Sequence, residues 1–155
     1  MTRRTEVAVA MLHQNNRWLL QLRDDVEGII APGCWGLFGG HLEAGESAEV
    51  GLRRELLEEI NLRASHLTPW FTHHNRQRLL HVFVGPLPVA VESLNLMEGQ
   101  DLTLASMGQI QRGRIYSRQL NENRALAGCL KLVVQQLRSN LPFDRHLNPI
   151  KEAGG

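Results

Sequence analysis

The chain has 155 residues, of which 43% are hydrophobic and 21% are charged, and its formal net charge at pH 7 is +1. These values are typical of one soluble globular domain with its own core. The near-neutral charge gives no general attraction to a nucleic acid polymer or to an anionic membrane. No segment has the length of a membrane span and no convincing signal peptide is present, so we expect a cytoplasmic protein.

Two cysteines, Cys34 and Cys129, are too few for a disulfide framework or a cysteine metal site. We expect both to be reduced and partly buried thiols.

The first half of the chain is predicted to contain short strands and one strong helix. Residues 6–12 and 18–23 are rich in apolar side chains, and Asn15 and Asn16 between them tolerate the positive φ of a tight turn. Gly and Pro mark residues 24–36 as a loop. A short strand at residues 37–43 leads to a helix that begins after Ser47, a good N-cap, and runs to Ile60.

The second half is predicted to contain a hairpin from residues 67–75 and 78–87, then a loop with some strand character at residues 89–101. Residues 117–140 are predicted to form a second long helix. Its buried stripe would consist of Leu126, Cys129, Leu130, Val133, Val134 and Leu137. Hairpins among helices favour a mixed or antiparallel sheet, so we expect an α/β protein of the α+β type. One domain at residues 1–140 would precede a loose tail at residues 141–155.

Six of the sixteen acidic residues lie between residues 39 and 62. On the predicted helix, Glu55, Glu58 and Glu59 fall within an arc of roughly 100°. Their mutual repulsion is offset in part by Arg54, and the remainder indicates that a cation completes the site. The alternative is a solvated acidic helix face. The opposite side carries the apolar residues Val50, Leu56, Leu57 and Ile60, with Leu52 at its border.

The spacing of charged residues between residues 40 and 62 is specific. It resembles the signature of the Nudix hydrolases, G-x5-E-x7-R-E-U-x-E-E-x-G-U, in which U is aliphatic. The matching residues are Gly40, Glu46, Arg54, Glu55, Leu56, Glu58, Glu59 and Leu62. Asn61 stands where the family has Gly. Because Asn is the second choice for the left-handed residue that closes a helix, we expect Asn61 to adopt that conformation.

The resemblance implies the Nudix fold, a mixed β-sheet sandwiched between helices. It also implies a hydrolase of acid anhydrides in phosphorus-containing substrates, which uses Mg²⁺ or Mn²⁺ to cleave a nucleoside diphosphate linked to another group, X. The expected partner is therefore a small nucleotide diphosphate derivative, bound by a monomer or a homodimer.

Roles for individual residues follow from the same resemblance. The expected metal ligands are Glu55, Glu58, Glu59 and the carbonyl of Gly39. The expected general base is Glu58 or Glu98, and Glu98 lies in an "EGQ" segment that resembles a loop of MutT-type enzymes. Arg23 and Gly40 are expected to contact the substrate, and Arg54 and Glu46 to brace the loop against the helix. For Arg23 and Glu98, a plain surface charge is the alternative.

Arg23 and Glu98 favour a MutT-like (d)NTP pyrophosphatase within the family. Phe38 departs from that subgroup, which often has Pro at this position. The alternatives are a hydrolase of nucleotide sugars, ADP-ribose or dinucleoside polyphosphates, and a non-catalytic module that senses a nucleotide. The intact glutamates weigh against the non-catalytic module. Arg78 and Asn121 or Asn123 are weaker candidates for base contacts.

Overall fold

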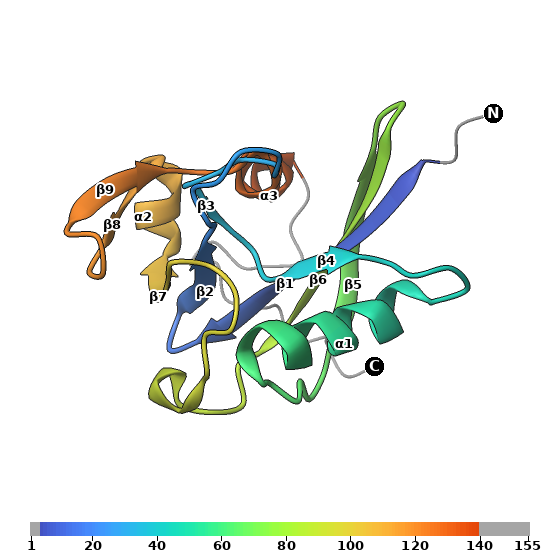
Figure 1. Cartoon of the computed structure of the whole chain (residues 1–155), viewed down its shortest axis with the longest axis horizontal. Coiled ribbons are helices and arrows are strands. Elements are labelled where there is room, and N and C mark those ends of the chain that lie inside the picture. The colour runs from blue at the N-terminus through green and yellow to red at the C-terminus, as the bar shows by residue number, and fades with distance from the viewer. Residues whose placement is uncertain (1–3, 140–155) are drawn as a thin grey trace.

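The computed structural model describes residues 4–139 (Figure 1). Within them, seven strands form one sheet and two more form a separate hairpin. The sheet strands are β1 (Thr5–Gln14), β2 (Arg17–Leu22), β3 (Trp35–Gly36), β4 (Gly39–His41), β5 (Thr68–His74), β6 (Arg78–Pro86) and β7 (Asp101–Ser106). The hairpin is β8 (Arg114–Ser117) with β9 (Glu122–Ala125). The helices are α1 (Ala48–Ile60), α2 (Met107–Gln111) and α3 (Gly128–Ser139), with a 3-10 turn η1 (Val91–Ser93).

The sheet is mixed, as predicted. Its main order is β3-β2-β1-β6-β5, with β4 also paired to β1 and β7 to β2. β1 runs antiparallel to β2 and β4 but parallel to β6. The turn between β1 and β2 has Asn15 and Asn16 at φ values of 52° and 60°, which confirms the predicted turn.

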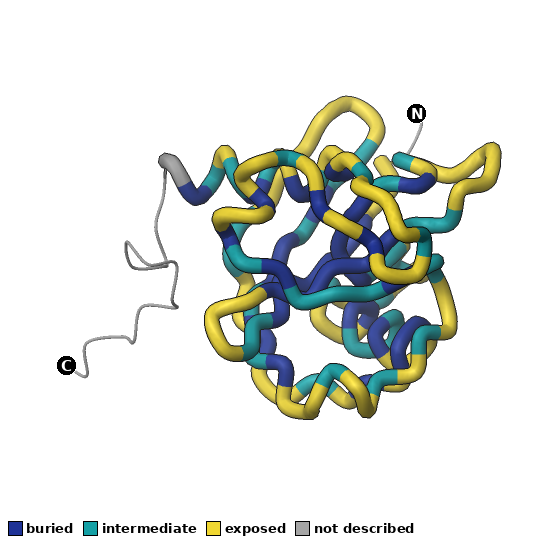
Figure 2. The backbone as a smooth tube through the Cα atoms, turned by 90° about the vertical axis from the view of Figure 1, so that its left-hand side faces the viewer, coloured by how far each residue is buried: buried dark blue, intermediate teal, exposed yellow. Residues whose placement is uncertain are grey.

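Helices cover both faces of the sheet, which confirms the predicted sandwich (Figure 1). Alternate residues of β1 point to opposite faces and enter two different hydrophobic clusters. Val7, Val9 and Met11 join the cluster beneath α2 and α3. The small residues Ala8 and Ala10 join the cluster beneath α1. The strands at the centre are buried and the outer loops are exposed (Figure 2).

The prediction of one long helix at residues 117–140 was wrong for residues 117–127. β8 ends at Ser117, where the Ser117 hydroxyl donates a 2.7 Å hydrogen bond to Asp101 Oδ2. Asn121 then adopts a φ of 55° and returns the chain as β9. The helix begins at Gly128, and its buried residues include Leu130, Val133 and Leu137 as expected. The predicted tail lies outside the described residues.

The predicted apolar side of α1 also needs correction. Val50 and Leu57 are 58% and 39% exposed, whereas Leu52, Leu56 and Ile60 are fully buried. The packed face of α1 is therefore centred on Leu52, Leu56 and Ile60, which are spaced four residues apart.

The segment at residues 89–101, predicted to be a loop with some strand character, contains the 3-10 turn η1 and a loop. Strand structure begins only at Asp101, the first residue of β7. No helix in the described part of the chain is long and apolar enough to cross a membrane.

Candidate active site

Helix α1 is fixed at both ends by local sequence. The Ser47 hydroxyl accepts a 3.2 Å hydrogen bond from the Val50 N–H, which caps the first turn as predicted. Asn61 adopts φ 52° and ψ 38°, which confirms the expected left-handed conformation. The Leu62 N–H then donates to the Leu56 carbonyl at 3.2 Å and closes the last turn. These two caps set where α1 begins and ends.

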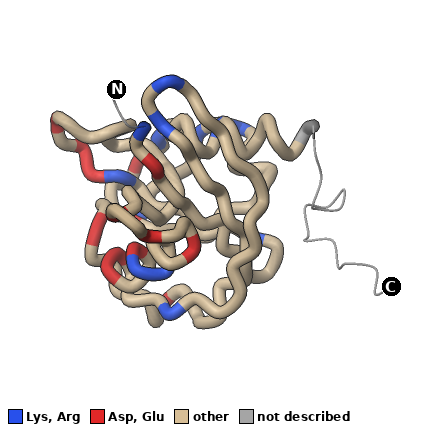
Figure 3. The backbone as a smooth tube through the Cα atoms, turned by 90° about the vertical axis from the view of Figure 1, so that its right-hand side faces the viewer, with Lys and Arg blue, Asp and Glu red and all other residues tan. Residues whose placement is uncertain are grey.

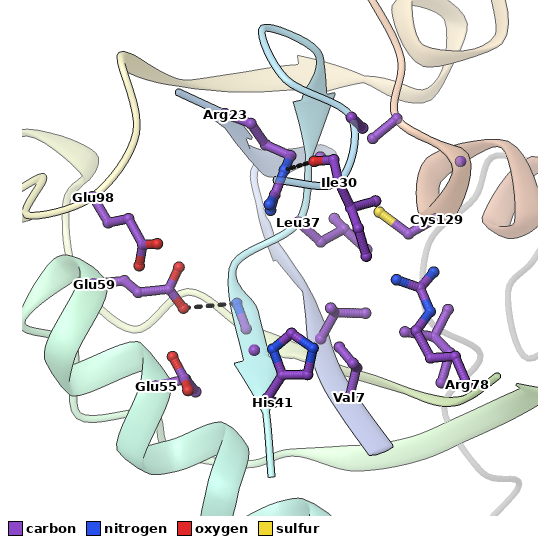
Figure 4. Close-up of a pocket in the computed structure, with 18 residues that line it drawn as sticks. Val7, Arg23, Ile30, Leu37, His41, Glu55, Glu59, Arg78, Glu98 and Cys129 are labelled. Atoms are coloured by element: carbon purple, nitrogen blue, oxygen red, sulfur yellow. Dashed lines mark hydrogen bonds between the residues drawn. The ribbon is translucent and has the colours of Figure 1, made fainter. Parts of the chain in front are cut away.

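A cavity of about 290 Å³ opens between α1, the sheet, the loop after β2 and the start of α3 (Figure 4). One end is acidic and is lined by Glu55, Glu59 and Glu98. Arg23 and Arg78 lie toward the other end (Figure 4). That end has apolar walls, which include Val7, Val9, Leu37, Leu80 and Ile30.

Glu59 is the most buried of the carboxylates, with 2% of its surface exposed. Its Oε1 accepts a 2.9 Å hydrogen bond from the Gly39 N–H, and its Oε2 lies 3.4 Å from Nε2 of Gln21. Burial raises the pKa of Glu59 to about 9, and the neighbouring Glu98 and Glu55 carboxylates add to the increase. Negative charge at this position therefore lacks compensation in the protein alone.

Glu55 lies beside Gly40 on the wall of the cavity. A Cβ at position 40 would come within 2.6 Å of the Glu55 carboxyl carbon, so the missing side chain makes room for this carboxylate. Burial also raises the pKa of Glu55, although the Arg54 guanidinium, 3.1 Å away, opposes the increase. Glycine at position 40 thus keeps the space in front of Glu55 open.

Glu58 does not line the cavity. Its side chain is 58% exposed, and its Oε2 forms an ion pair with Nη1 of Arg54 at 3.3 Å. The sequence predicted convergence of Glu55, Glu58 and Glu59, but the structure brings together Glu55, Glu59 and Glu98. Figure 3 shows acidic residues gathered on one side of the molecule, around α1.

Arg54 and Glu46 form a two-point ion pair between the helix and the loop before it. The distances are 2.8 Å from Nε to Oε2 and 2.9 Å from Nη2 to Oε1. Nη2 also donates to the His41 carbonyl at 3.1 Å. The pKa of Glu46 falls to about 2, first because of its hydrogen bonds with Arg54 and second because of the bond from the Glu43 N–H. This geometry suits the bracing role expected for the pair, which stays a prediction.

The carboxylates suit a hard divalent cation. Mg²⁺ and Mn²⁺ prefer oxygen ligands, and the acidic end presents Glu55 and Glu59, whose pKa values are raised by burial and by neighbouring carboxylates. In residues 4–139, no three His, Cys, Asp or Glu side chains form a preformed ligand group. A cation would therefore have to draw the side chains closer. Such a cation would compete with Arg54 for the Glu58 carboxylate, which points outward in this structure.

Arg23 directly follows β2 and points into the cavity from the side opposite α1 (Figure 4). Its Nε donates a 2.6 Å hydrogen bond to the Ile30 carbonyl, which orients the guanidinium and leaves its terminal nitrogens for a ligand. Arg78, a weaker candidate, also lines the cavity. Asn121 and Asn123 lie in the β8–β9 hairpin and are not part of the cavity lining.

Sequence reasoning missed Gln21, which lies beneath the acidic end. Gln21 is a polar residue within the run of buried apolar residues 18–22, and this is a signal because a buried amide needs hydrogen-bond partners. It also missed Cys129, which lines the cavity from the first turn of α3, and the loop residues Ile30 and Ala31. Cys129, Ile30 and Ala31 adjoin the site through the tertiary fold, and no local pattern marks these three residues.

The NUDIX domain model matches residues 2–113 of the chain. The chain belongs to the NUDIX family.

Curated relatives match over a shorter region. Nucleoside triphosphatase NudI of Escherichia coli O139:H28 (strain E24377A / ETEC) is 36% identical over 70 residues, which are 44% of this chain and 49% of the relative. The same enzyme of Escherichia coli O1:K1 / APEC gives the same identity and coverage. This Nudix chain therefore matches about half the length of these curated relatives.

Solved structures share the fold over most of the chain. The MutT NUDIX hydrolase from Burkholderia pseudomallei has a TM-score of 0.67 at 16% identity, covering 88% of this chain and 99% of that one. The solution structure of the E. coli ORF135 protein has a TM-score of 0.63 at 25% identity, covering 92% and 96%. The NUDIX domain of Shewanella oneidensis NrtR, complexed with ADP ribose, has a TM-score of 0.65 at 16% identity, covering 89% and 88%.

Proposed function

We propose that this chain is a Nudix pyrophosphohydrolase that uses Mg²⁺ or Mn²⁺ to cleave a nucleoside diphosphate linked to another group, with a (d)NTP as the first candidate substrate. The observation that carries the proposal is the division of one cavity into an acidic end and an end with arginines and apolar walls. A cation suits the acidic end, and a diphosphate suits the space between that cation and Arg23. A nucleoside suits the apolar walls.

The proposed ligands for the cation are Glu55, Glu58 and Glu59, together with the Gly39 carbonyl. A divalent cation supplies charge neutralisation of the phosphates, polarisation of the phosphoryl oxygen and a more acidic water. The chain itself positions the substrate. Gly39 and Gly40 expose their backbone to the phosphates, and the terminal nitrogens of Arg23 bind a phosphate oxygen. The Arg54–Glu46 pair holds the loop in place.

A base must accept the proton from the attacking water, and Glu98 or Glu58 is proposed for this role. Glu98 is supported by its position in the cavity, where its carboxyl group lies against that of Glu59 (Figure 4). Glu58 lies outside the lining and would have to exchange its contact with Arg54 first. The geometry thus favours Glu98.

A nucleoside triphosphate is favoured as substrate by the NudI relatives, which carry that name. ADP-ribose, nucleotide sugars and dinucleoside polyphosphates are the alternatives. The fold accommodates one of them, since the NrtR domain was solved with ADP ribose. A non-catalytic sensing module is disfavoured because all three signature glutamates are present.

The test is a panel of nucleoside triphosphates, ADP-ribose, nucleotide sugars and dinucleoside polyphosphates, assayed with Mg²⁺, with Mn²⁺ and with EDTA. We expect metal-dependent release of a nucleoside monophosphate, identified by chromatography. Glu58→Gln tests the metal site without disturbing the fold, because the exposed Glu58 side chain contributes little packing. We expect this variant to keep the melting temperature of the wild type and to lose about 100-fold or more in kcat. Nucleotide binding without turnover would support the sensing module instead.

A further inference from the structure

Gln21 is a buried polar residue of β2, with 2% of its surface exposed. Its neighbours Leu20 and Leu22 belong to the cluster beneath α2 and α3, whereas Leu19 belongs to the cluster beneath α1. Because side chains alternate along a strand, Gln21 points to the α1 face with Leu19. A buried amide on this face requires hydrogen-bond partners.

Two partners accept from the single Nε2 of Gln21. One is the main-chain carbonyl of Glu98 at 3.1 Å, and the other is Oε2 of Glu59 at 3.4 Å. An amide nitrogen has two hydrogens, so both contacts can be made together. Gln21 therefore connects the helix that carries one carboxylate to the loop that carries the other.

The loop around Glu98 fits closely against β2 at this point. The Gln100 N–H donates to the Leu22 carbonyl at 2.8 Å, and Gly99 has a φ of 99°. A Cβ at Gly99 would lie 2.8 Å from the Leu22 carbonyl oxygen and 3.0 Å from Cγ of Gln21. The loop therefore packs directly on the Gln21 side chain, next to the residue that carries the Glu98 carboxylate.

We propose that Gln21 is a positioning residue of the active site: its amide holds the Glu98 loop beside Glu59 and so sets the spacing of carboxylates at the acidic end. The inference rests on the proposed function, because spacing matters there for cation binding and proton transfer. Gln21 acts through Glu98 and Glu59 and does not itself touch the substrate.

The main variant is Gln21→Met, which keeps the length of the side chain and removes the donor. Gln14→Met is the matched control. Nε2 of Gln14 also donates to two main-chain carbonyls, those of Leu87 at 3.1 Å and Val89 at 2.8 Å, but Gln14 is not part of the cavity lining. We expect Gln21→Met to lower kcat about tenfold or more with KM nearly unchanged, and Gln14→Met to leave both unchanged. Equal kcat losses in the two variants would overturn the proposal.

A double-mutant cycle with Glu98→Gln separates positioning from a general structural effect. If Gln21 acts through Glu98, Gln21→Met causes little further loss of kcat when Glu98 is already Gln. Losses that multiply in the double variant would overturn the proposal. Should Gln21→Met fail to fold, Gln21→Asn, whose amide is one methylene too short, replaces it in both arms of the test.

Binding of Mn²⁺, followed by electron paramagnetic resonance of the free ion, provides a readout without turnover. We expect Gln21→Met to weaken Mn²⁺ binding about threefold or more, and Gln14→Met to leave it unchanged. Equal Mn²⁺ affinities in the two variants would overturn the proposal even if no substrate were found. Failure of the proposed function has a different result, namely a wild-type protein that cleaves no nucleotide of the panel.

Discussion

The N–H of Gly39 donates a 2.9 Å hydrogen bond to Oε1 of Glu59, which joins β4 to α1 at the acidic end of the cavity. Gly39 has a φ of 143°, and a Cβ at this position would lie 2.0 Å from the Ala8 carbonyl oxygen. Glycine therefore allows β4 to approach β1 closely enough for this bond to form. The backbone thus holds the buried carboxylate at the position proposed for a cation ligand.

Glu59→Gln should stabilise the metal-free protein at alkaline pH while it reduces turnover. The pKa of Glu59 is about 9 in the folded protein against 4.5 for an ordinary glutamate, so between these values the folded state binds more protons than the unfolded state. Stability therefore falls as pH rises from 4.5 to 9. We expect Glu59→Gln to flatten this decline, measured as the melting temperature in EDTA from pH 5 to 9. The prediction would be contradicted if the melting temperature of the variant fell with pH as steeply as that of the wild type.

Glu98→Gln should lower kcat strongly and change KM much less, because a base or metal ligand acts mainly in the transition state. The measurement is a steady-state assay at saturating substrate and excess Mg²⁺. A loss in kcat of less than about threefold, which is about 0.7 kcal/mol, would remove Glu98 from the catalytic residues.

Glu46→Gln should reduce stability at neutral pH and have no effect in strong acid. The folded-state pKa of Glu46 is about 2, below the 4.5 of an ordinary glutamate, because Arg54 binds the carboxylate. The contribution of Glu46 is thus fully present above pH 4.5 and is lost as pH falls toward 2. We expect the melting temperatures of variant and wild type to differ at pH 7 and to converge near pH 2. A constant difference across this range would show that the ion pair is not the cause.

Asn61→Gly should be neutral or slightly stabilising, within about 0.5 kcal/mol, because Gly accepts the φ of 52° without strain but loses more backbone entropy. Asn61→Ala is the matched variant. It should destabilise the protein by about 1 kcal/mol, since a Cβ without a polar group disfavours the left-handed conformation. Chemical denaturation measures both values. A larger loss for Gly than for Ala would contradict the explanation.

Much of the site could be predicted because its residues lie close together in the sequence. Glu55 and Glu59 are one helical turn apart, and Asn61 ends the helix through its own conformational preference. The orientation of Glu58 could not be predicted, because it depends on a contact with Arg54 that competes with the cavity. The contacts of Gln21 with Glu59 and with the Glu98 carbonyl join segments that are far apart in the sequence. The periodicity of the sequence gives no information about such contacts.

The error at residues 117–127 has a similar origin. Their composition is compatible with a helix, yet Ser117 is held by Asp101 and the Leu120 N–H binds the Ser117 hydroxyl at 3.1 Å. These bonds start a turn before a helix can form. Tertiary hydrogen bonding from β7 thus decided the local structure, whereas the buried stripe of α3 was recognisable from its spacing.

The two ends of the cavity are built from different parts of the chain. The carboxylates belong to α1 and to the loop before β7, whereas Ile30 and Ala31 belong to the loop after β2. Main-chain carbonyls anchor that loop, since Arg23 binds the Ile30 carbonyl and Arg124 lies 3.3 Å from the Gly33 carbonyl. Its side chains are therefore free to change without loosening the anchor. Such modularity makes the protein evolvable: the group accepted at one end can be exchanged while the chemistry at the other is inherited intact.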